Sequence, residues 1–280
     1  MRELAIAIPS NILEDCQSLS EKTHKLGIIA RAASIFKVTK IHVYRNQGRS
    51  DKELIILLLR YLVTPQYLRK NIFPIKQELK LAGTLPPLRI PSHTVNRQYN
   101  PNIVEIRDGV CVQFDKKSKI SIIDLGLKRH GVLRDNIPIG DLVTVKIISE
   151  SYEGKYNNYF LLQKSKPKDY WGYDISYNKS LNDVFTSNNY DIKVITSKFG
   201  SDLNSNIELI SKDIEKNPNS SILIAFGSPK IGLMSVLSRE KINKSNLFIV
   251  NLFPNQGVET IRSEEAIMAG LSIFNSLNSN

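Results

Sequence analysis

Two stretches near the end of the chain decide its fold: SILIAFGSPKIGL (residues 221–233) and LFIVNLFPNQGVETIRSEEAIMAGL (residues 247–271). Each begins with an apolar run of strand length, passes into a loop with Gly and Pro, and continues into residues at helical spacing. In the second stretch and just beyond it, Ile267, Leu271 and Phe274 recur at i, i+4 and i+7. Strand, loop and helix in alternation predict an α/β protein.

The same alternation extends in both directions from these stretches. At the start of the chain Asp51 is a plausible N-cap for the helix ELIILLLRYL, and Gly83 is placed to end the helix that follows it. The sequence predicts strands at 4–8, 40–45, 191–196, 221–226 and 247–253, and helices at 18–36, from 51, at 66–82, 203–215, 231–239 and 263–277.

Between these two parts the sequence changes character. LPPLRIPSHTV (residues 85–95) holds three prolines, which remove backbone donors and cannot continue a helix. From about 103 to 166, short strand-like runs alternate with turns, and Asp108-Gly109 is a hairpin signal. We therefore expect an α/β domain formed by residues 1–85 and 167–280, with a small OB-like β-barrel inserted at 86–166.

The net charge of +11 is concentrated in one part of the 280 residues. Residues 1–85 carry a net charge of +7 and residues 86–166 of +5, whereas residues 167–280 carry −1. A regional basic excess favours a polyanionic partner such as RNA, although an ordinary solvated surface is the alternative for each cation taken singly. The candidate RNA-binding residues are Arg107, Lys116, Lys117, Lys119, Lys128 and Arg129.

Several other classes of protein are disfavoured by the sequence. The longest aliphatic run, residues 54–59, is far short of the roughly 20 residues that cross a bilayer, and the start of the chain lacks the apolar region of a signal peptide. We expect no membrane association and a cytoplasmic location. Cys16 and Cys111 are expected to be reduced thiols, and four histidines without ligand spacing predict no metal site.

Ligands of open α/β sheets bind beyond the carboxyl ends of the strands, which directs attention to residues 196–200, 227–233 and 251–260. These loops contain Gly and Pro and predict rigid backbone cradles rather than acid–base sites. They match neither the dinucleotide fingerprint GxGxxG nor a Walker A loop, and the chain has no GxSxG elbow.

Taken together, the second and third of these loops resemble motifs of a known protein family. FGSPKIGL (residues 226–233) and IVNLFPNQGVETIRSEEAIMAGL (residues 249–271) resemble the two cofactor-loop motifs of the SPOUT, or α/β-knot, RNA methyltransferases. Within that superfamily the chain is most similar to the archaeal and eukaryotic family that acts on nitrogen 3 of uridine. KLGIIARAASIFKV (residues 25–38) is similar to the family's first motif, whose arginine is Arg31 here. An inserted barrel is also the family's arrangement, so the resemblance covers essentially the whole chain.

The resemblance implies a fold and a cofactor that residue patterns alone do not give. It implies a C-terminal trefoil knot, S-adenosyl-L-methionine held in a bent form by the knot loops, and a homodimer with each site near the partner subunit. It also implies that the substrate is RNA, and ribosomal RNA in particular. The cofactor-binding residues carried over are Thr196, Gly227, Ser228, Pro229, Gly232, Leu252, Asn255, Gln256, Gly257 and Thr260.

Three charged residues are candidates for catalysis. Arg31 would bind phosphate or stabilise the deprotonated base, with a routine surface salt bridge as the alternative. Glu259 would accept a proton or anchor the cofactor amine, with a solvated loop carboxylate as the alternative. Arg262 would hold substrate phosphate across the dimer, or would pair with an acid such as Glu265.

The leading hypothesis is thus a methyltransferase that transfers a methyl group from S-adenosyl-L-methionine to a base of structured RNA, with uridine N3 as the acceptor. A non-catalytic RNA-binding or ribosome-assembly protein with the same fold is the alternative. An α/β enzyme for a small-molecule substrate is disfavoured because no other motif set is present and the inserted segment is basic.

Overall fold

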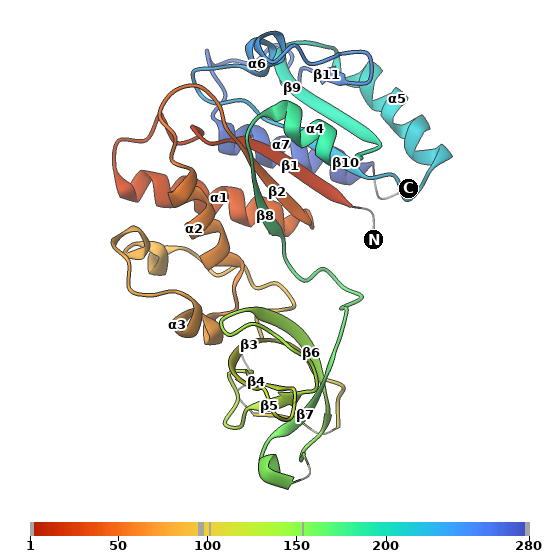
Figure 1. The fold of residues 1–280 in the computed structure, drawn as a ribbon. Helices are drawn as coiled ribbons and strands as arrows, with labels where there is room; N and C mark the ends of the chain where they lie inside the picture. The colour runs from red at the N-terminus through yellow and green to blue at the C-terminus, as the bar shows by residue number, and fades with distance from the viewer. Residues whose placement is uncertain (1–2, 95–97, 101, 153, 278–280) are drawn as a thin grey trace. The chain divides into compact units, whose positions relative to one another are not determined.

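The computed structural model describes residues 3–94, 98–100, 102–152 and 154–277 (Figure 1). The chain divides into two compact units, each assembled from separate pieces of sequence. Unit 1 comprises Met1–Leu62, Glu78–Pro87 and Gly172–Asn280, and unit 2 comprises Val63–Gln77 and Leu88–Trp171. Residues 63–77 therefore fall in the same unit as the barrel, whereas the sequence analysis placed them in the first segment.

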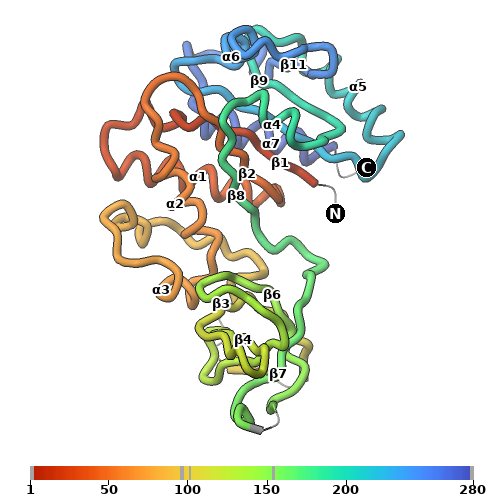
Figure 2. The backbone as a smooth tube through the Cα atoms, in the orientation of Figure 1, coloured from red at the N-terminus to blue at the C-terminus, as the bar shows by residue number. Residues whose placement is uncertain are grey.

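A parallel six-stranded sheet forms the centre of unit 1. Its order is β11-β9-β10-β1-β2-β8, and every neighbouring pair is parallel. Strands β1 and β10 are apolar throughout and fully buried, as expected of strands covered on both faces. In Figure 2 the red strand β1 lies beside β10, whose colour marks a much later part of the chain. The strands are β1 (Leu4–Pro9), β2 (Lys40–Tyr44), β8 (Asp174–Asn178), β9 (Ile192–Ser201), β10 (Ile222–Ala225) and β11 (Phe248–Val250).

Helices α1, α4 and α5 of unit 1 each follow a polar residue whose side chain caps the first turn. Ser18 caps α1 by accepting a hydrogen bond from the backbone N–H of Glu21, and Asp202 caps α5 through the N–H groups of Asn204 and Ser205. Helices α1 and α7 lie against each other. The helices are α1 (Leu19–Ile35), α2 (Lys52–Val63), α4 (Leu181–Ser187), α5 (Leu203–Lys216), α6 (Leu233–Arg239) and α7 (Ser263–Ser276).

Unit 2 contains a closed five-stranded barrel with the order β3-β4-β5-β7-β6. Strands β5 and β7 pair in parallel, and the other described pairs of the barrel are antiparallel. Its core is apolar and includes Cys111, Ile123, Val145 and Phe160. The strands are β3 (Ile106–Asp115), β4 (Ile120–Asp124), β5 (Gly131–Leu133), β6 (Leu142–Ser149) and β7 (Phe160–Lys164), with η4 (Gly154–Tyr156) before β7.

The single helix predicted over residues 66–82 is wrong. That region forms short turns, because Pro74 lacks a backbone donor and the preceding Phe73 is extended. Gly83 lies inside the last of these turns and does not end a longer helix. These elements are single helical turns: η1 (Gln66–Leu68), α3 (Arg69–Ile72), η2 (Gln77–Leu79) and η3 (Ala82–Thr84).

The hairpin predicted at Asp108-Gly109 is also wrong, because both residues lie inside strand β3. A Cβ added at Gly109 would collide with the side chain of Ile123 on β4. Glycine is therefore required there for close strand packing rather than for a turn. The turn between β3 and β4 comes later and includes Lys119, which has a positive φ of 53°. Strand β8 and helix α4 were not predicted.

Candidate functional site

A pocket of about 430 Å³ lies in unit 1 at the carboxyl ends of β9, β10 and β11, where α6 and α7 begin. The labels β9, β11 and α6 locate this region in Figure 1. Parallel sheets bind ligands at this end because the loops and the helix N-termini converge there. The pocket is lined by residues 196–199, 226–230, 232–235, 251–253, 256, 259–261, 263 and 266.

Residues 196–200, predicted as a loop, are instead the second half of strand β9. The Thr196 hydroxyl donates to the carbonyl of Ala225 at 3.0 Å, which ties the pocket edge to β10. A Cβ at Gly200 would lie 2.5 Å from the carbonyl carbon of Val250. This glycine lets β11 pass close enough to pair with β9. The predicted loop is therefore a strand, but its residues 196–199 line the pocket as expected.

The loop after β10 is fixed from several sides. The backbone N–H of Phe226 donates to Ala7 on β1, and the buried hydroxyl of Tyr44 donates to the Phe226 carbonyl, both at 2.9 Å. A Cβ at Gly227 would come within 3.2 Å of the Ile231 carbonyl oxygen. The loop therefore closes on itself at Gly227, and a larger residue would force its backbone to shift.

Polar side chains that follow β1 in the sequence form hydrogen bonds with the same loop. The carboxylate of Glu14 accepts hydrogen bonds from the Ser228 hydroxyl at 2.8 Å and from the Lys230 N–H at 3.0 Å. The amide nitrogen of Asn11 lies 3.3 Å from the same hydroxyl oxygen. Asn11 is buried and also contacts Asn46, whose side chain accepts a hydrogen bond from Arg239. The pocket wall at residues 228–230 is thus organised by residues outside it.

Two sets of hydrogen bonds shape the loop after β11: one from the side chain of Gln256 within the loop, and one at the start of α7. The side-chain amide of Gln256 donates to the carbonyls of Val258 at 2.8 Å and Glu259 at 2.9 Å. Asn255 takes a positive φ of 61°, which turns the chain. The N–H of Arg262 donates to the Glu265 carboxylate at 2.9 Å, as at many helix starts.

Most predicted cofactor residues line this pocket. Asn255 and Gly257 are exposed and do not, and the space around Gly257 is open for a Cβ. Of the predicted catalytic residues, Glu259 lines the pocket, whereas Arg31 and Arg262 do not; one guanidinium nitrogen of Arg31 donates to the Pro87 carbonyl at 3.4 Å. The predicted cofactor residues that line it are Thr196, Gly227, Ser228, Pro229, Gly232, Leu252, Gln256 and Thr260.

Sequence reasoning missed part of the site. Lys198 and Lys230 place two cations on the pocket lining, and Phe226 adds an aromatic wall. The sequence analysis also did not predict Asn11 and Glu14, which fix the loop at residues 228–230. Their signal was present, because PSNILED (residues 9–15) is a polar segment directly after a buried strand, where the rule for parallel sheets applies.

Five of the six predicted RNA-binding residues keep solvent access on unit 2, but Arg107 does not. It is 1% exposed, its Nε donates to the Leu125 carbonyl at 3.1 Å, and it forms an ion pair with Glu105. Its guanidinium also lies over the ring of Tyr67, and burial raises the pKa of that phenol to about 12. Arg107 is a structural arginine of unit 2. The accessible residues are Lys116, Lys117, Lys119, Lys128 and Arg129.

The unit 1 pocket offers backbone groups, neutral amides and hydroxyls, apolar walls, two lysines and one carboxylate. Such a lining suits a small ligand that is partly apolar and carries polar ends. Within the described parts of the chain, no three His, Cys, Asp or Glu side chains are grouped to hold a metal ion. Among the described helices, none combines the length and the apolar character that crossing a bilayer requires.

Residues 3–274 match the protein family described as "Putative RNA methyltransferase". The 28S rRNA (uridine-N(3))-methyltransferase of Drosophila melanogaster is 31% identical over 306 residues, which cover 96% of this chain and 61% of the fly protein. The human protein of the same name is 32% identical over 308 residues, covering 96% of this chain and 77% of the relative. An uncharacterised protein of Halobacterium salinarum is 26% identical over 288 residues, covering 95% and 96%. The chain thus spans about three fifths of the fly protein.

Proposed function

Because the chain belongs to the RNA methyltransferase family that its residues 3–274 match, we propose that it transfers a methyl group from S-adenosyl-L-methionine to N3 of a uridine in ribosomal RNA. The pocket at the carboxyl ends of β9, β10 and β11 carries the proposal, because the two motif loops converge there. The fly and human relatives support the choice of acceptor through the reaction in their names.

The pocket fits this cofactor in chemistry as well as in size. S-adenosyl-L-methionine joins a flat purine, a ribose and a zwitterionic amino acid, and small-ligand pockets hold about 300–1,000 Å³. Phe226, Leu252 and Ile261 give apolar walls for the purine, while Ser228 and Thr260 give polar side chains for the ribose and the amino acid. When bound, the cofactor supplies an activated methyl group on its sulfonium.

The protein's own contribution is positioning and proton handling. Methylation at N3 forms a nitrogen–carbon bond and releases the N3 proton, so a base must accept that proton. Glu259 is the carboxylate on the pocket lining and is the candidate acceptor. Holding the two reactants in line provides up to roughly 7–11 kcal/mol of the barrier reduction in favourable systems.

The proposal includes a homodimer, and it gives roles to the two arginines that lie outside the pocket. Arg31 and Arg262 are proposed to hold substrate phosphates, Arg262 at the site of the partner subunit in a homodimer. Apolar side chains near the pocket support this arrangement, since Phe199 is 74% and Val258 57% exposed, and a second copy would cover them. Sedimentation of the purified chain as a monomer would argue against this part of the proposal.

Unit 1 is proposed to be a SPOUT domain with a C-terminal trefoil knot. A Cβ added at Gly270 on α7 would come within 3.1 Å of Leu252 and 3.3 Å of Phe226, and this close approach fits a C-terminal helix packed against the motif loops. Unit 2 is proposed to hold an OB-like barrel, supported by its five-strand closure. Its exposed lysines would bind RNA phosphates, with an affinity that falls steeply with salt.

The first experiment is calorimetric titration of the full chain with S-adenosyl-L-methionine and with its demethylated product. We expect saturable binding of both, and we expect Gly227→Leu to abolish it because the side chain would displace the loop. Gly83→Ala is the matched control, since Gly83 is exposed, lies outside the pocket lining and leaves open space for a Cβ, so the change should leave binding unchanged.

The second experiment detects the product. Ribosomal RNA from cells lacking the gene is incubated with protein and cofactor, and nucleosides are identified by mass spectrometry. We expect 3-methyluridine with wild type and at least a hundredfold loss of rate with Glu259→Gln at unchanged cofactor affinity, which is the range of general base catalysis. A folded chain that binds RNA but not the cofactor at millimolar concentration would favour the ribosome-assembly alternative.

A further inference from the structure

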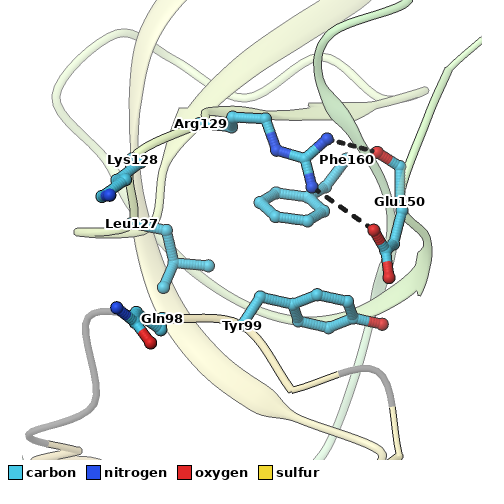
Figure 3. A pocket seen from close by; sticks show the side chains of 7 residues that line it. All are labelled: Gln98, Tyr99, Leu127, Lys128, Arg129, Glu150 and Phe160. Carbon is cyan, nitrogen blue, oxygen red and sulfur yellow. Dashed lines mark hydrogen bonds and ion pairs between the residues drawn. The ribbon is translucent and has the colours of Figure 1, made fainter.

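A second pocket, of about 400 Å³, lies within unit 2, and no step proposed above uses it. Figure 3 shows the Phe160 ring between the guanidinium of Arg129 and the ring of Tyr99, with Leu127 closing one side. Gln98 and Glu150 stand at the rim. The pocket therefore combines flat unsaturated groups at its base with polar groups at its edge.

The aromatic part is built into the barrel. Phe160 is 2% exposed, and its ring centroid lies 5.0 Å from that of Tyr99 with the planes tilted by 56°. The guanidinium carbon of Arg129 lies 4.2 Å from the Phe160 centroid, a cation–π contact. These groups form a fixed surface on which a flat ligand can stack.

Arg129 is held in place but remains accessible. Its Nη1 donates to the Glu150 backbone carbonyl at 3.0 Å, and its Nη2 lies 3.7 Å from the Glu150 carboxylate. Even so, 32% of its side chain is exposed. A guanidinium fixed by a ring and by acceptors loses little conformational freedom when a ligand stacks on it, so the site is preorganised.

The rim groups select for a flat ring with hydrogen-bonding edges. The Gln98 amide both donates and accepts, the Glu150 carboxylate accepts, and the Lys128 ammonium donates. The surrounding residues 86–166 carry a net charge of +5, which favours a ligand attached to a polyanion. A nucleobase on an RNA strand has this combination of features.

We propose that this pocket binds one unpaired nucleobase of the RNA substrate, which stacks on the ring of Tyr99 and meets the planar guanidinium of Arg129 past the edge of Phe160. The proposal rests on the proposed function, because it assumes that RNA is the substrate. A base within a duplex is stacked on both sides and cannot enter a concave pocket, whereas a loop or bulge can present one. The site therefore selects single-stranded segments, while exposed lysines such as Lys116 and Lys117 contact phosphates without selecting sequence.

The test measures binding of the full chain to a labelled ten-nucleotide single-stranded RNA and to the corresponding duplex. Tyr99→Ala should weaken single-strand binding about tenfold, the typical effect of losing one stacked base, and should leave duplex binding unchanged. Tyr99→Phe should restore binding, because it keeps the ring. Arg129→Lys should weaken binding several-fold, since it keeps the charge but loses the planar group.

Arg134→Ala is the matched control. Arg134 is also a cation of unit 2 over an aromatic ring, 5.3 Å from the centroid of Tyr152, but it does not line the pocket. Its loss should weaken single-strand and duplex binding alike and lower the salt dependence, as expected for a phosphate contact. A 2-aminopurine in the oligonucleotide should be quenched by wild type and not by Tyr99→Ala.

Equal effects of Tyr99→Ala and Arg134→Ala on both RNA forms would overturn the pocket assignment. Cofactor titration of the same variants separates this failure from failure of the proposed function. A chain that binds the cofactor and RNA but ignores Tyr99→Ala lacks the base pocket alone. A chain that binds neither the cofactor nor RNA refutes the methyltransferase proposal, and the base pocket with it.

Discussion

At the edge of the unit 1 pocket, some side chains line the cavity and others fix the loop that carries them. Ser228 lines the pocket, but its hydroxyl donates to Glu14, which lies outside. Glu14 also accepts from the Lys230 N–H, so one carboxylate fixes two points of the loop. A charged acceptor forms stronger hydrogen bonds than a neutral one, and the loop conformation consequently depends on this residue.

Replacing Glu14 by alanine should therefore weaken cofactor binding. We expect Glu14→Ala to lower the affinity for S-adenosyl-L-methionine about tenfold, because the Ser228 hydroxyl and the Lys230 N–H lose their acceptor and the loop must reorder on binding. Calorimetry checks this result, with Glu215→Ala on α5 as a control that removes an exposed carboxylate outside the pocket. Unchanged affinity in Glu14→Ala would show that the loop holds its shape without this support.

A buried histidine makes the stability of unit 1 sensitive to acid. His42 on β2 is fully buried, with one ring nitrogen 2.8 Å from the Tyr190 hydroxyl and the other 2.8 Å from the Ser176 hydroxyl. Burial, and next the charge of Lys40, lower the pKa of His42 from 6.5 to about 4. The unfolded chain therefore binds a proton at pH values where the folded chain does not.

The sign of the pH effect follows from this difference. The contribution of His42 is fully present above pH 6.5 and is lost as pH falls towards 4, with a total of about 3 kcal/mol. Urea unfolding between pH 7 and 4.5 measures the slope, and His42→Gln should reduce it. Identical slopes in the two proteins over that interval would contradict the lowered pKa.

At the scale of elements, the sequence predicted the parts that depend on local patterns. Apolar runs such as ILIA in β10 and the spacing of Ile267, Leu271 and Phe274 in α7 specify their elements directly, since burial dictates the period. The helix at 66–82 failed because Pro74 outweighed the surrounding propensities. The loop predicted at residues 196–200 failed because β11 pairs with β9 on both sides of that segment, at Ile195 and again at Ser201, and this partner lies about 50 residues away in the sequence.

In the candidate site too, the sequence predicted what depends on local patterns and missed what depends on tertiary contacts. Glycines and amides after a strand marked most of the pocket lining, because the carboxyl ends of parallel strands meet at one edge. The exclusion of Arg31 from the pocket and the burial of Arg107 depend on tertiary contacts with Pro87 and Leu125. No local pattern in the sequence encodes such contacts.

Gly200 shows how one residue supports a whole element. A Cβ there would lie 2.5 Å from the Val250 carbonyl carbon and 2.7 Å from the Asn251 nitrogen, both backbone atoms that cannot rotate away. We expect Gly200→Ala to displace β11 and to lower the free energy of unfolding by about 1–3 kcal/mol. Thermal melting measures the loss, and Gly257→Ala should melt like wild type. A wild-type melting temperature for Gly200→Ala would mean that β11 moves without cost.

At the scale of the molecule, two units with separate cores share one chain. Unit 1 contains the pocket assigned to the cofactor, and unit 2 holds the barrel with its exposed cations. Each unit has its own buried apolar cluster, as independently stable domains do. The charge follows the pocket loops rather than the units: residues 167–280, which hold the lining of the unit 1 pocket, carry −1, whereas residues 86–166 carry +5 and residues 1–85, most of them in unit 1, carry +7.

Ligand binding should therefore stabilise the units unequally. At a concentration 100 times its dissociation constant, S-adenosyl-L-methionine should stabilise unit 1 by about 2.7 kcal/mol and leave unit 2 unchanged. Hydrogen exchange followed by mass spectrometry assigns protection to each unit, and we expect slower exchange in β9, β10 and α6 but not in β3–β7. Equal protection of the barrel strands would show that the units respond as one body.

The pairing of β1 with β10, in which Leu4 lies opposite Ile222, also constrains how the protein is made. A ribosome adds roughly 5–20 residues per second, so the first strand waits ten seconds or more for its neighbour to emerge. During that interval the apolar strand β1 lacks this partner, although strands β3–β7, which lie between β1 and β10 in the sequence, have already been synthesised. We expect nascent chains stalled before residue 222 to recruit chaperones through β1 and α1, and release of the full chain to end that contact.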